Sequence, residues 1–135
     1  MTSPVELHAA VLAALEAIPH VAAHDGRVPK DLPADSEGRV YPYAVLWGSP
    51  GHTPTEGRNL EGDADGALEW PVQVTVAAGD ITWCLAACAE VRAALDGLRF
   101  HGGVLQEEPG AGVRPDDDTT PPRFYAPLLF RSLHP

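Results

Sequence analysis

Six histidines and a run of three aspartates are the residues best able to bind a metal or transfer protons. The aspartates at 116–118 are consecutive, so their side chains diverge, and the register of a calcium-binding loop is absent. We interpret this run, with Asp63 and Asp65, as solvated acidic loop. None of the histidines has the HExxH, HxH or C-x-x-C spacing that gathers zinc ligands. His8 is expected on the polar face of a helix. The other five histidines are expected in loops, namely His20, His24, His52, His101 and His134.

No known catalytic motif accompanies these groups. Ser49 lies in a Gly-Ser-Pro-Gly sequence, where a loop follows in place of the helix that a nucleophile elbow requires. The glycines at 102–103 and 110–112 lack both the lysine of a phosphate-binding loop and the dinucleotide fingerprint. The chain is therefore expected to be no enzyme and to use no metal or cofactor. A metal-dependent hydrolase with catalytic aspartates at 116–118 stays as the least favoured alternative.

The first element expected to position these residues is a helix over 3–18. Ser3 can cap it, Pro4 suits the first helical position, and Glu6 can complete a capping box. Apolar residues then recur at the spacing of one buried helical stripe, namely Leu7, Val11, Ala14, Leu15 and Ile18.

A second helix is predicted from the cap residue Asp80 to about Asp96, where Gly97 ends it. Its buried stripe contains both cysteines of the chain and consists of Ile81, Cys84, Cys88, Val91 and Leu95. Two thiols four residues apart in one helix meet disulfide geometry poorly, so a reduced, cytosolic setting is expected.

Three strands are predicted over 40–47, 70–78 and 123–133 from alternating apolar residues. Pro42 implies that the first strand starts there or lies at a sheet edge, and Pro127 implies an edge for the last. Shorter strands are expected at 100–106 and 112–114, with a short edge strand at 27–28. This order predicts an α+β fold, a mainly antiparallel sheet of four to five strands with two helices packed on one face.

The chain has 135 residues, the length of one domain, with a long loop at 48–69 that lacks large apolar groups. A formal net charge of −10 argues against a surface that grips DNA, because such binding needs clustered cations. No segment is apolar enough to span a membrane, and the N-terminus does not have the basic region of a signal peptide.

Several side chains are candidates for contacts with other proteins. Trp83 lies off the buried stripe of its helix, and the 40–47 strand is apolar on both faces. We expect interface roles for Tyr41, Tyr43, Trp47 and Trp83, and an acidic rim formed by Asp116, Asp117 and Asp118. For each aromatic residue of the strand, packing in the core is the competing role.

Four phrases, taken in order, resemble the tail terminator (tail completion) proteins of long-tailed bacteriophages of actinobacterial hosts. They are RVPKDLP at 27–33, YPYAVLWGSPG at 41–51, WPVQVTV at 70–76 and VRPDDDTTPPRFYAPLLFRSL at 113–133. Their collinear order over most of the chain carries the resemblance. The apolar Pro127-Leu128-Leu129 departs from the more polar alternation expected in the last strand.

The resemblance implies a homohexameric ring at the head-proximal end of the tail tube. Such a ring stops polymerisation of the tail tube protein and joins the tail to the head-tail connector or stopper protein. It would be found at the tail-neck junction of the virion, and in the host cytoplasm during assembly. Genomic DNA would pass through the lumen without specific binding, for which an acidic bore is suited. Another small neck or head-tail joining protein is the nearest alternative.

Overall fold

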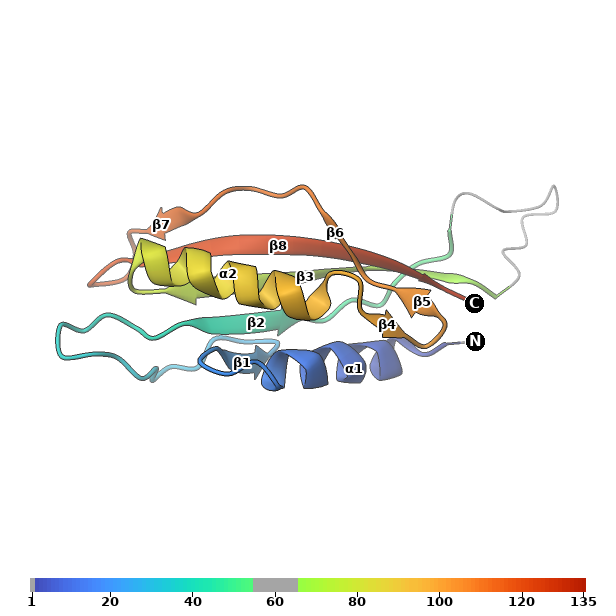
Figure 1. Ribbon diagram of the computed structural model, residues 1–135, viewed down its shortest axis with the longest axis horizontal. Helices are drawn as coiled ribbons and strands as arrows, with labels where there is room; N and C mark the ends of the chain where they lie inside the picture. The colour runs from blue at the N-terminus through green and yellow to red at the C-terminus, as the bar shows by residue number, and fades with distance from the viewer. Residues whose placement is uncertain (1, 55–65) are drawn as a thin grey trace.

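The computed structural model describes residues 2–54 and 66–135. Two helices and eight strands follow one another in the order α1, β1–β3, α2, β4–β8 (Figure 1). Their bounds are α1 Pro4–Glu16, β1 Ala22–Asp25, β2 Tyr43–Trp47, β3 Leu68–Ala78, α2 Ile81–Leu95, β4 Arg99–Phe100, β5 Gly103–Val104, β6 Gln106–Glu108, β7 Arg114–Asp116 and β8 Arg123–His134. No helix within the described residues is long and apolar enough to cross a membrane.

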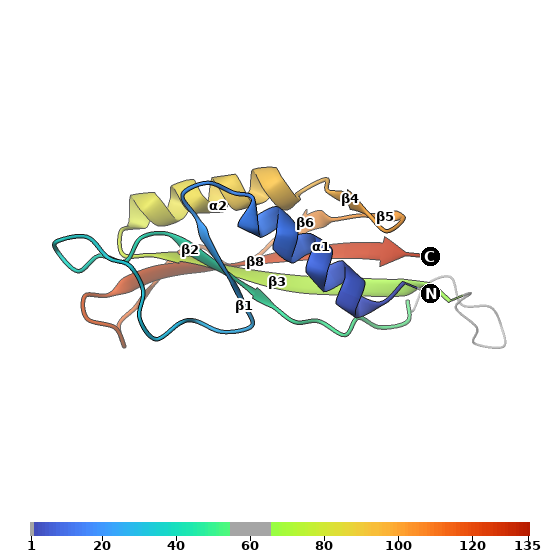
Figure 2. The ribbon, with the colours of Figure 1, turned by 90° about the horizontal axis from the view of Figure 1, so that it is seen from below.

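A six-stranded sheet forms the centre of the fold, with strand order β1-β2-β3-β8-β6 and with β7 also paired to β8. Every pairing in it is antiparallel except the parallel pair of β1 and β2. A small hairpin of β4 and β5 stands apart. The predicted α+β class is confirmed, with slightly more strands than expected, and the long strands β3 and β8 run side by side through its middle (Figure 2).

Both helices pack on one face of this sheet, as predicted. The stripe of α1 is fully buried at Leu7, Val11 and Leu15, and Ser3 caps the helix by accepting a hydrogen bond from Val5 N. The main core joins these residues to α2 and to one face of three strands, through Ala44, Leu46, Trp70, Val72, Val74, Val76, Cys84, Cys88, Val91, Leu95, Ala126, Leu128 and Phe130.

The opposite face of the sheet is covered only in part. A second, smaller cluster of buried residues lies there, formed by Val40, Tyr43, Val45 and Ala77 with Leu32 packed against it. It is built where the segment between β1 and β2 folds back over the sheet. The remainder of that face, along β3 and β8, is partly exposed, with Pro71, Gln73, Arg131 and Leu133 open to solvent.

The proline positions correct one prediction. Strand β2 begins directly after Pro42 and lies between β1 and β3, so Pro42 marks a strand start. The edge position inferred from Pro127 is wrong for the strand as a whole, because β8 lies between β3 on one side and β6 and β7 on the other. Pro127 is tolerated inside the sheet because the strands on the other side of β8 pair only with 123–125 and 129–131, leaving a gap beside it.

The short edge strand expected at 27–28 is also misplaced. The structure instead puts β1 at Ala22–Asp25, in parallel register with β2, and residues 27–28 lie outside any strand. Alanine, histidine and aspartate have weak strand propensity, so the local sequence gives little indication of β1. Val40, which we expected to open the next strand, makes only an isolated bridge to Ala34.

Candidate functional site

Tyr41 and Trp83, two of the predicted interface residues, meet on the helix side of the molecule. Their rings stack with centroids 5.9 Å apart and an interplanar angle of 20°. Trp83 sits in the first turn of α2 because Asp80 caps that helix, its Oδ1 accepting hydrogen bonds from Thr82 N at 2.8 Å and Trp83 N at 3.2 Å. Tyr41 remains 49% exposed, so the pair presents an aromatic surface to the solvent.

Arg39 completes this aromatic cluster. Its guanidinium carbon lies 4.7 Å from the centroid of the Trp83 ring, within the range of a cation–π contact. The guanidinium is held there by Asp35, whose Oδ2 accepts from Arg39 Nε at 2.8 Å, and it also lies 3.7 Å from Asp80 Oδ2. The turn between Asp35 and Arg39 is tight, and Gly38 allows it by adopting a φ of +81°.

The pKa of the Asp35 carboxyl is lowered from its ordinary value. Desolvation acts to raise it, but hydrogen bonds from the backbone and side chain of Arg39 and from the backbone of Glu37 together outweigh that effect. Because the folded-state pKa is depressed, the carboxylate stabilises the fold above its ordinary pKa. That stabilisation is lost as the pH falls through the folded-state pKa.

We therefore expect Asp35→Asn to lower the thermal unfolding midpoint at neutral pH, with the difference from wild type shrinking as the pH falls. Thermal unfolding followed by circular dichroism at about pH 7 and about pH 2.5 measures this. Asp31→Asn, a change in the same exposed loop, serves as the matched control. A difference that stays constant with pH would show that the Asp35 charge is not what matters.

An apolar groove of about 460 Å³ lies beside the Tyr41–Trp83 pair. Its polar side chains are His20 and Glu90, and its other lining residues are Val21, Tyr41, Pro42, Trp83, Ala86 and Ala87. Exposed aromatic side chains beside a groove of this kind are typical of surfaces that bind a bulky side chain of another protein.

The uncovered part of the sheet forms a second surface, on the other side of the molecule. Trp47 lies here, half-buried, with its Nε1 donating to Thr75 Oγ1 at 2.9 Å. Leu133 is 57% exposed at the far end of β8. We call this the open sheet face, and its members along β2, β3 and β8 are Trp47, Pro71, Gln73, Thr75, Pro127, Leu129, Arg131 and Leu133.

Tyr43 takes the core role that competed with an interface role. It is 4% exposed, and its hydroxyl oxygen lies 3.4 Å from the donor Arg123 Nη1. Four aromatic candidates are thus divided among three environments. The groove has two of them, the open sheet face has Trp47, and the smaller core has Tyr43.

The three aspartates form the tip of the hairpin between β7 and β8. Asp116 Oδ1 accepts from Asp118 N at 3.1 Å, which is a local turn, while Asp117 and Asp118 are exposed. Among the described residues no group of three or more histidine, cysteine, aspartate or glutamate side chains is placed to hold a metal ion. Asp63 and Asp65 lie outside the described residues.

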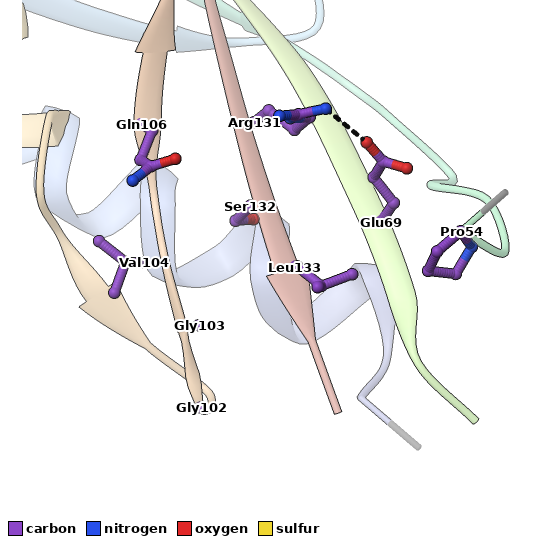
Figure 3. A pocket seen from close by; sticks show the side chains of 9 residues that line it. All are labelled: Pro54, Glu69, Gly102, Gly103, Val104, Gln106, Arg131, Ser132 and Leu133. Atoms are coloured by element: carbon purple, nitrogen blue, oxygen red, sulfur yellow. Dashed lines mark hydrogen bonds and ion pairs between the residues drawn. The ribbon is translucent and has the colours of Figure 1, made fainter. Parts of the chain in front are cut away.

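A larger cavity, of about 610 Å³, lies beside the C-terminal end of β8 (Figure 3). At its margin Arg131 forms ion pairs with Glu69 and Glu108, each at 3.0 Å. Ser132, which lines this cavity, donates its hydroxyl to His134 Nε2 at 2.7 Å, because His134 Nδ1–H donates to the His101 carbonyl oxygen at 3.0 Å.

This serine–histidine pair is a structural element of the β8 end. His134 is fully buried and Ser132 is only 3% exposed, so the pair is held within the packing at the end of β8. The loop position predicted for His134 is wrong. The alternation that places Leu128 and Phe130 in the core continues to the next two inward positions of β8, Ser132 and His134. Extending this alternation along the sequence would have predicted the buried position of His134.

Two other histidines also lie in or beside secondary structure. His24 was expected in a loop, but it belongs to β1, as does Asp25. Asp25 instead accepts from His8 of α1, with Nε2 and Oδ1 2.7 Å apart. His8 therefore ties the first helix to the edge strand.

Both cysteine thiols point into the core, as predicted. Cys84 is fully buried and Cys88 is 6% exposed. The pKa of Cys84 is strongly raised, first by its hydrogen bond with the Cys88 thiol and then by burial. Cys84 therefore acts as a small apolar side chain at neutral pH.

The described surface thus has two candidate places for protein contacts, the Tyr41–Trp83 groove and the open sheet face. Comparison with protein-family models and with curated proteins gives no match for this chain.

Proposed function

We propose that this chain is a structural virion protein, a tail terminator that caps the head-proximal end of a phage tail tube. In this role it stops polymerisation of the tube and joins the tail to the head-tail connector. The collinear phrases described above suggest the family. The observation that supports the proposal is that one small subunit has two unlike candidate contact surfaces on opposite sides of its sheet, an apolar groove and a mixed apolar and polar sheet face.

A closed ring of identical subunits needs two different contact surfaces on each subunit. Head-to-tail contacts join one patch to a different patch on the next copy, so each subunit must present two unlike surfaces. The groove is concave and apolar, whereas the open sheet face is broad and mixes Trp47 and Leu133 with polar side chains. Six copies joined in this way would expose two axial rims, one for the tube protein and one for the connector.

The acidity suits a ring through which DNA must move. Six copies with a net charge of −10 would total about −60, which repels phosphates within roughly a Debye length of 8–10 Å. The exposed Asp117 and Asp118, at the tip of the β7–β8 hairpin, are candidates for an acidic rim. Genomic DNA would then pass without binding.

Particles produced without this chain are expected to have tail tubes that are overlong and variable in length. Negative-stain images of tails assembled in its absence measure this. Tubes of normal length would contradict the proposal. Recovery of the chain on filled capsids made without tails would instead favour a head-side joining protein.

A variant connects this test to the groove. Tyr41→Ala removes a half-exposed ring from the groove without opening the main core, and we expect it to weaken capping of tube ends at least tenfold. Val28→Ala, which shortens another exposed apolar side chain, should cap tubes normally. Equal capping by both variants would exclude the groove from this contact.

A further inference from the structure

Helix α2 has an exposed apolar row that the fold of one subunit does not explain. Residues four apart are neighbours on a helix surface, and Ile81, Leu85, Ala89 and Ala93 form a row that slants across the solvent side of α2. Ile81 is 47% exposed and Leu85 is 54% exposed, and both alanines are exposed as well. We call these four residues the outer row.

The opposite side of α2 already fills the core of the subunit. Cys84, Cys88, Val91 and Leu95 are buried there, so this helix is apolar on both sides. A surface helix normally has one apolar stripe and one polar face, and a helix that is apolar all round is typically buried. The outer row therefore indicates a surface that another molecule covers.

The order of side-chain sizes along the outer row identifies that molecule. Two large residues, Ile81 and Leu85, come first, and two small ones, Ala89 and Ala93, follow. If a second α2 lies antiparallel across the first, each Leu85 faces an Ala89 and each Ile81 faces an Ala93. Large side chains then meet small ones at all four positions, which is how packed layers fill space without voids. A parallel pair would oppose leucine to leucine and leave a gap between the alanines.

We propose that a second copy of this chain docks on the outer row, forming a two-fold dimer through antiparallel α2 helices. A two-fold contact uses the same patch on both copies, so the patch must be complementary to itself. The outer row meets this condition because its large and small side chains pair with each other in the antiparallel arrangement. The proposal does not rest on the proposed function, because ring formation uses the groove and the open sheet face.

The charges of α2 agree with contact between like copies. Each chain has a net charge of −10, so a dimer forms only through a surface whose centre lacks charge. No charged residue occurs from Ile81 to Ala89. The two charged residues of the helix, Glu90 and Arg92, are opposite in sign. Arg92 lies on the same side of α2 as the outer row, next to its Ala93 end, and its charge is already paired with Glu107.

The direct test is the mass of the purified chain in sedimentation equilibrium. We expect a dimer of twice 14.3 kDa, with a dissociation constant on the order of 10 μM because the patch is small. Salt should strengthen the dimer, since screening reduces the repulsion between two acidic copies. Leu85→Glu should weaken it about 100-fold or more by burying a charge, whereas Val5→Glu, the same kind of change at an exposed position of α1, should leave it intact.

A paired substitution tests the antiparallel register. Ala89→Leu alone opposes leucine to Leu85 and should weaken the dimer, and Leu85→Ala alone should weaken it by leaving a void. The double variant Leu85→Ala with Ala89→Leu again sets each leucine against an alanine and should restore the wild-type dissociation constant. All these positions are exposed in the subunit, so the thermal midpoint of the monomer should hardly change.

Three results would overturn the proposal. The first is a wild-type chain that stays monomeric at about 100 μM in both low and high salt, ten times the expected dissociation constant. The second is a dimer that Leu85→Glu leaves unchanged. The third is a double variant no tighter than its two parents. Because none of these measurements involves a tail tube, failure here leaves the capping proposal standing, and normal tail length leaves the dimer proposal standing.

Discussion

Replacing Gly79 with alanine is expected to destabilise the fold by about 3 kcal/mol or more. A Cβ at this position would lie 2.5 Å from Val40 N and 2.7 Å from Arg39 Cα. These are backbone atoms, so no side chain can rotate away to make room. The same close approach allows Gly79 N to donate to Val40 O at 2.8 Å, and the added methyl group would break this contact.

Gly79→Ala should change the shape of the groove as well as lower the stability of the fold. Val40 lies between Arg39 and Tyr41 in the chain, and both of these residues contact Trp83. Pushing Val40 away from Gly79 therefore separates the aromatic pair. Urea unfolding measures the loss of stability, and Gly48→Ala is the matched control because nothing lies within 4 Å of its added Cβ. Equal stability of the two variants would contradict the close approach.

Trp70→Ala is expected to cost about 3–5 kcal/mol of unfolding free energy. Trp70 is fully buried, and its ring meets that of Phe100 edge-on at 6.1 Å between centroids. Its Nε1 also donates to Ser49 O at 2.9 Å, which fixes the segment that follows β2. Alanine leaves a cavity between the sheet and the β4–β5 hairpin and removes this hydrogen bond, so both elements lose support.

Trp47→Ala provides the comparison, since it removes a side chain of the same type, but from the open sheet face. Trp47 is half-buried and contacts Thr75 at the surface of the sheet, so we expect a loss of only about 1–2 kcal/mol. Thermal unfolding should show midpoints that differ between the two variants by roughly 10 °C. Similar midpoints would mean that Trp70 does not pack as the structure places it.

The helices were the part of the fold that the sequence predicted best. Ser3 and Asp80 are cap residues that act on the next two or three amides, and the apolar stripes recur within a single helix. Such signals are local, so they can be read without knowing the rest of the chain. The three main strands were found for the same reason, by alternation along each strand.

The strand neighbours were not predictable in this way. Whether Pro127 lies at an edge depends on where β6 and β7 end, and the strand β1 exists because β2 offers it hydrogen bonds. The candidate site could not be predicted from local sequence for the same reason. Tyr41 and Trp83 were each chosen as exposed aromatics, but their stacking needs the turn at Gly38 and the close approach of Gly79 to Val40.

The sequence by itself determined the helix positions, the alternating strands, the acidic net charge and the absence of a known catalytic motif. Each of these depends on composition or on residues within a few positions of one another. Only the tertiary structure decided which aromatic side chains form a groove, which one joins the core, and which face of α2 remains apolar and exposed. Those outcomes depend on contacts between residues far apart in the chain, and the energy of such contacts is set by burial and packing in three dimensions.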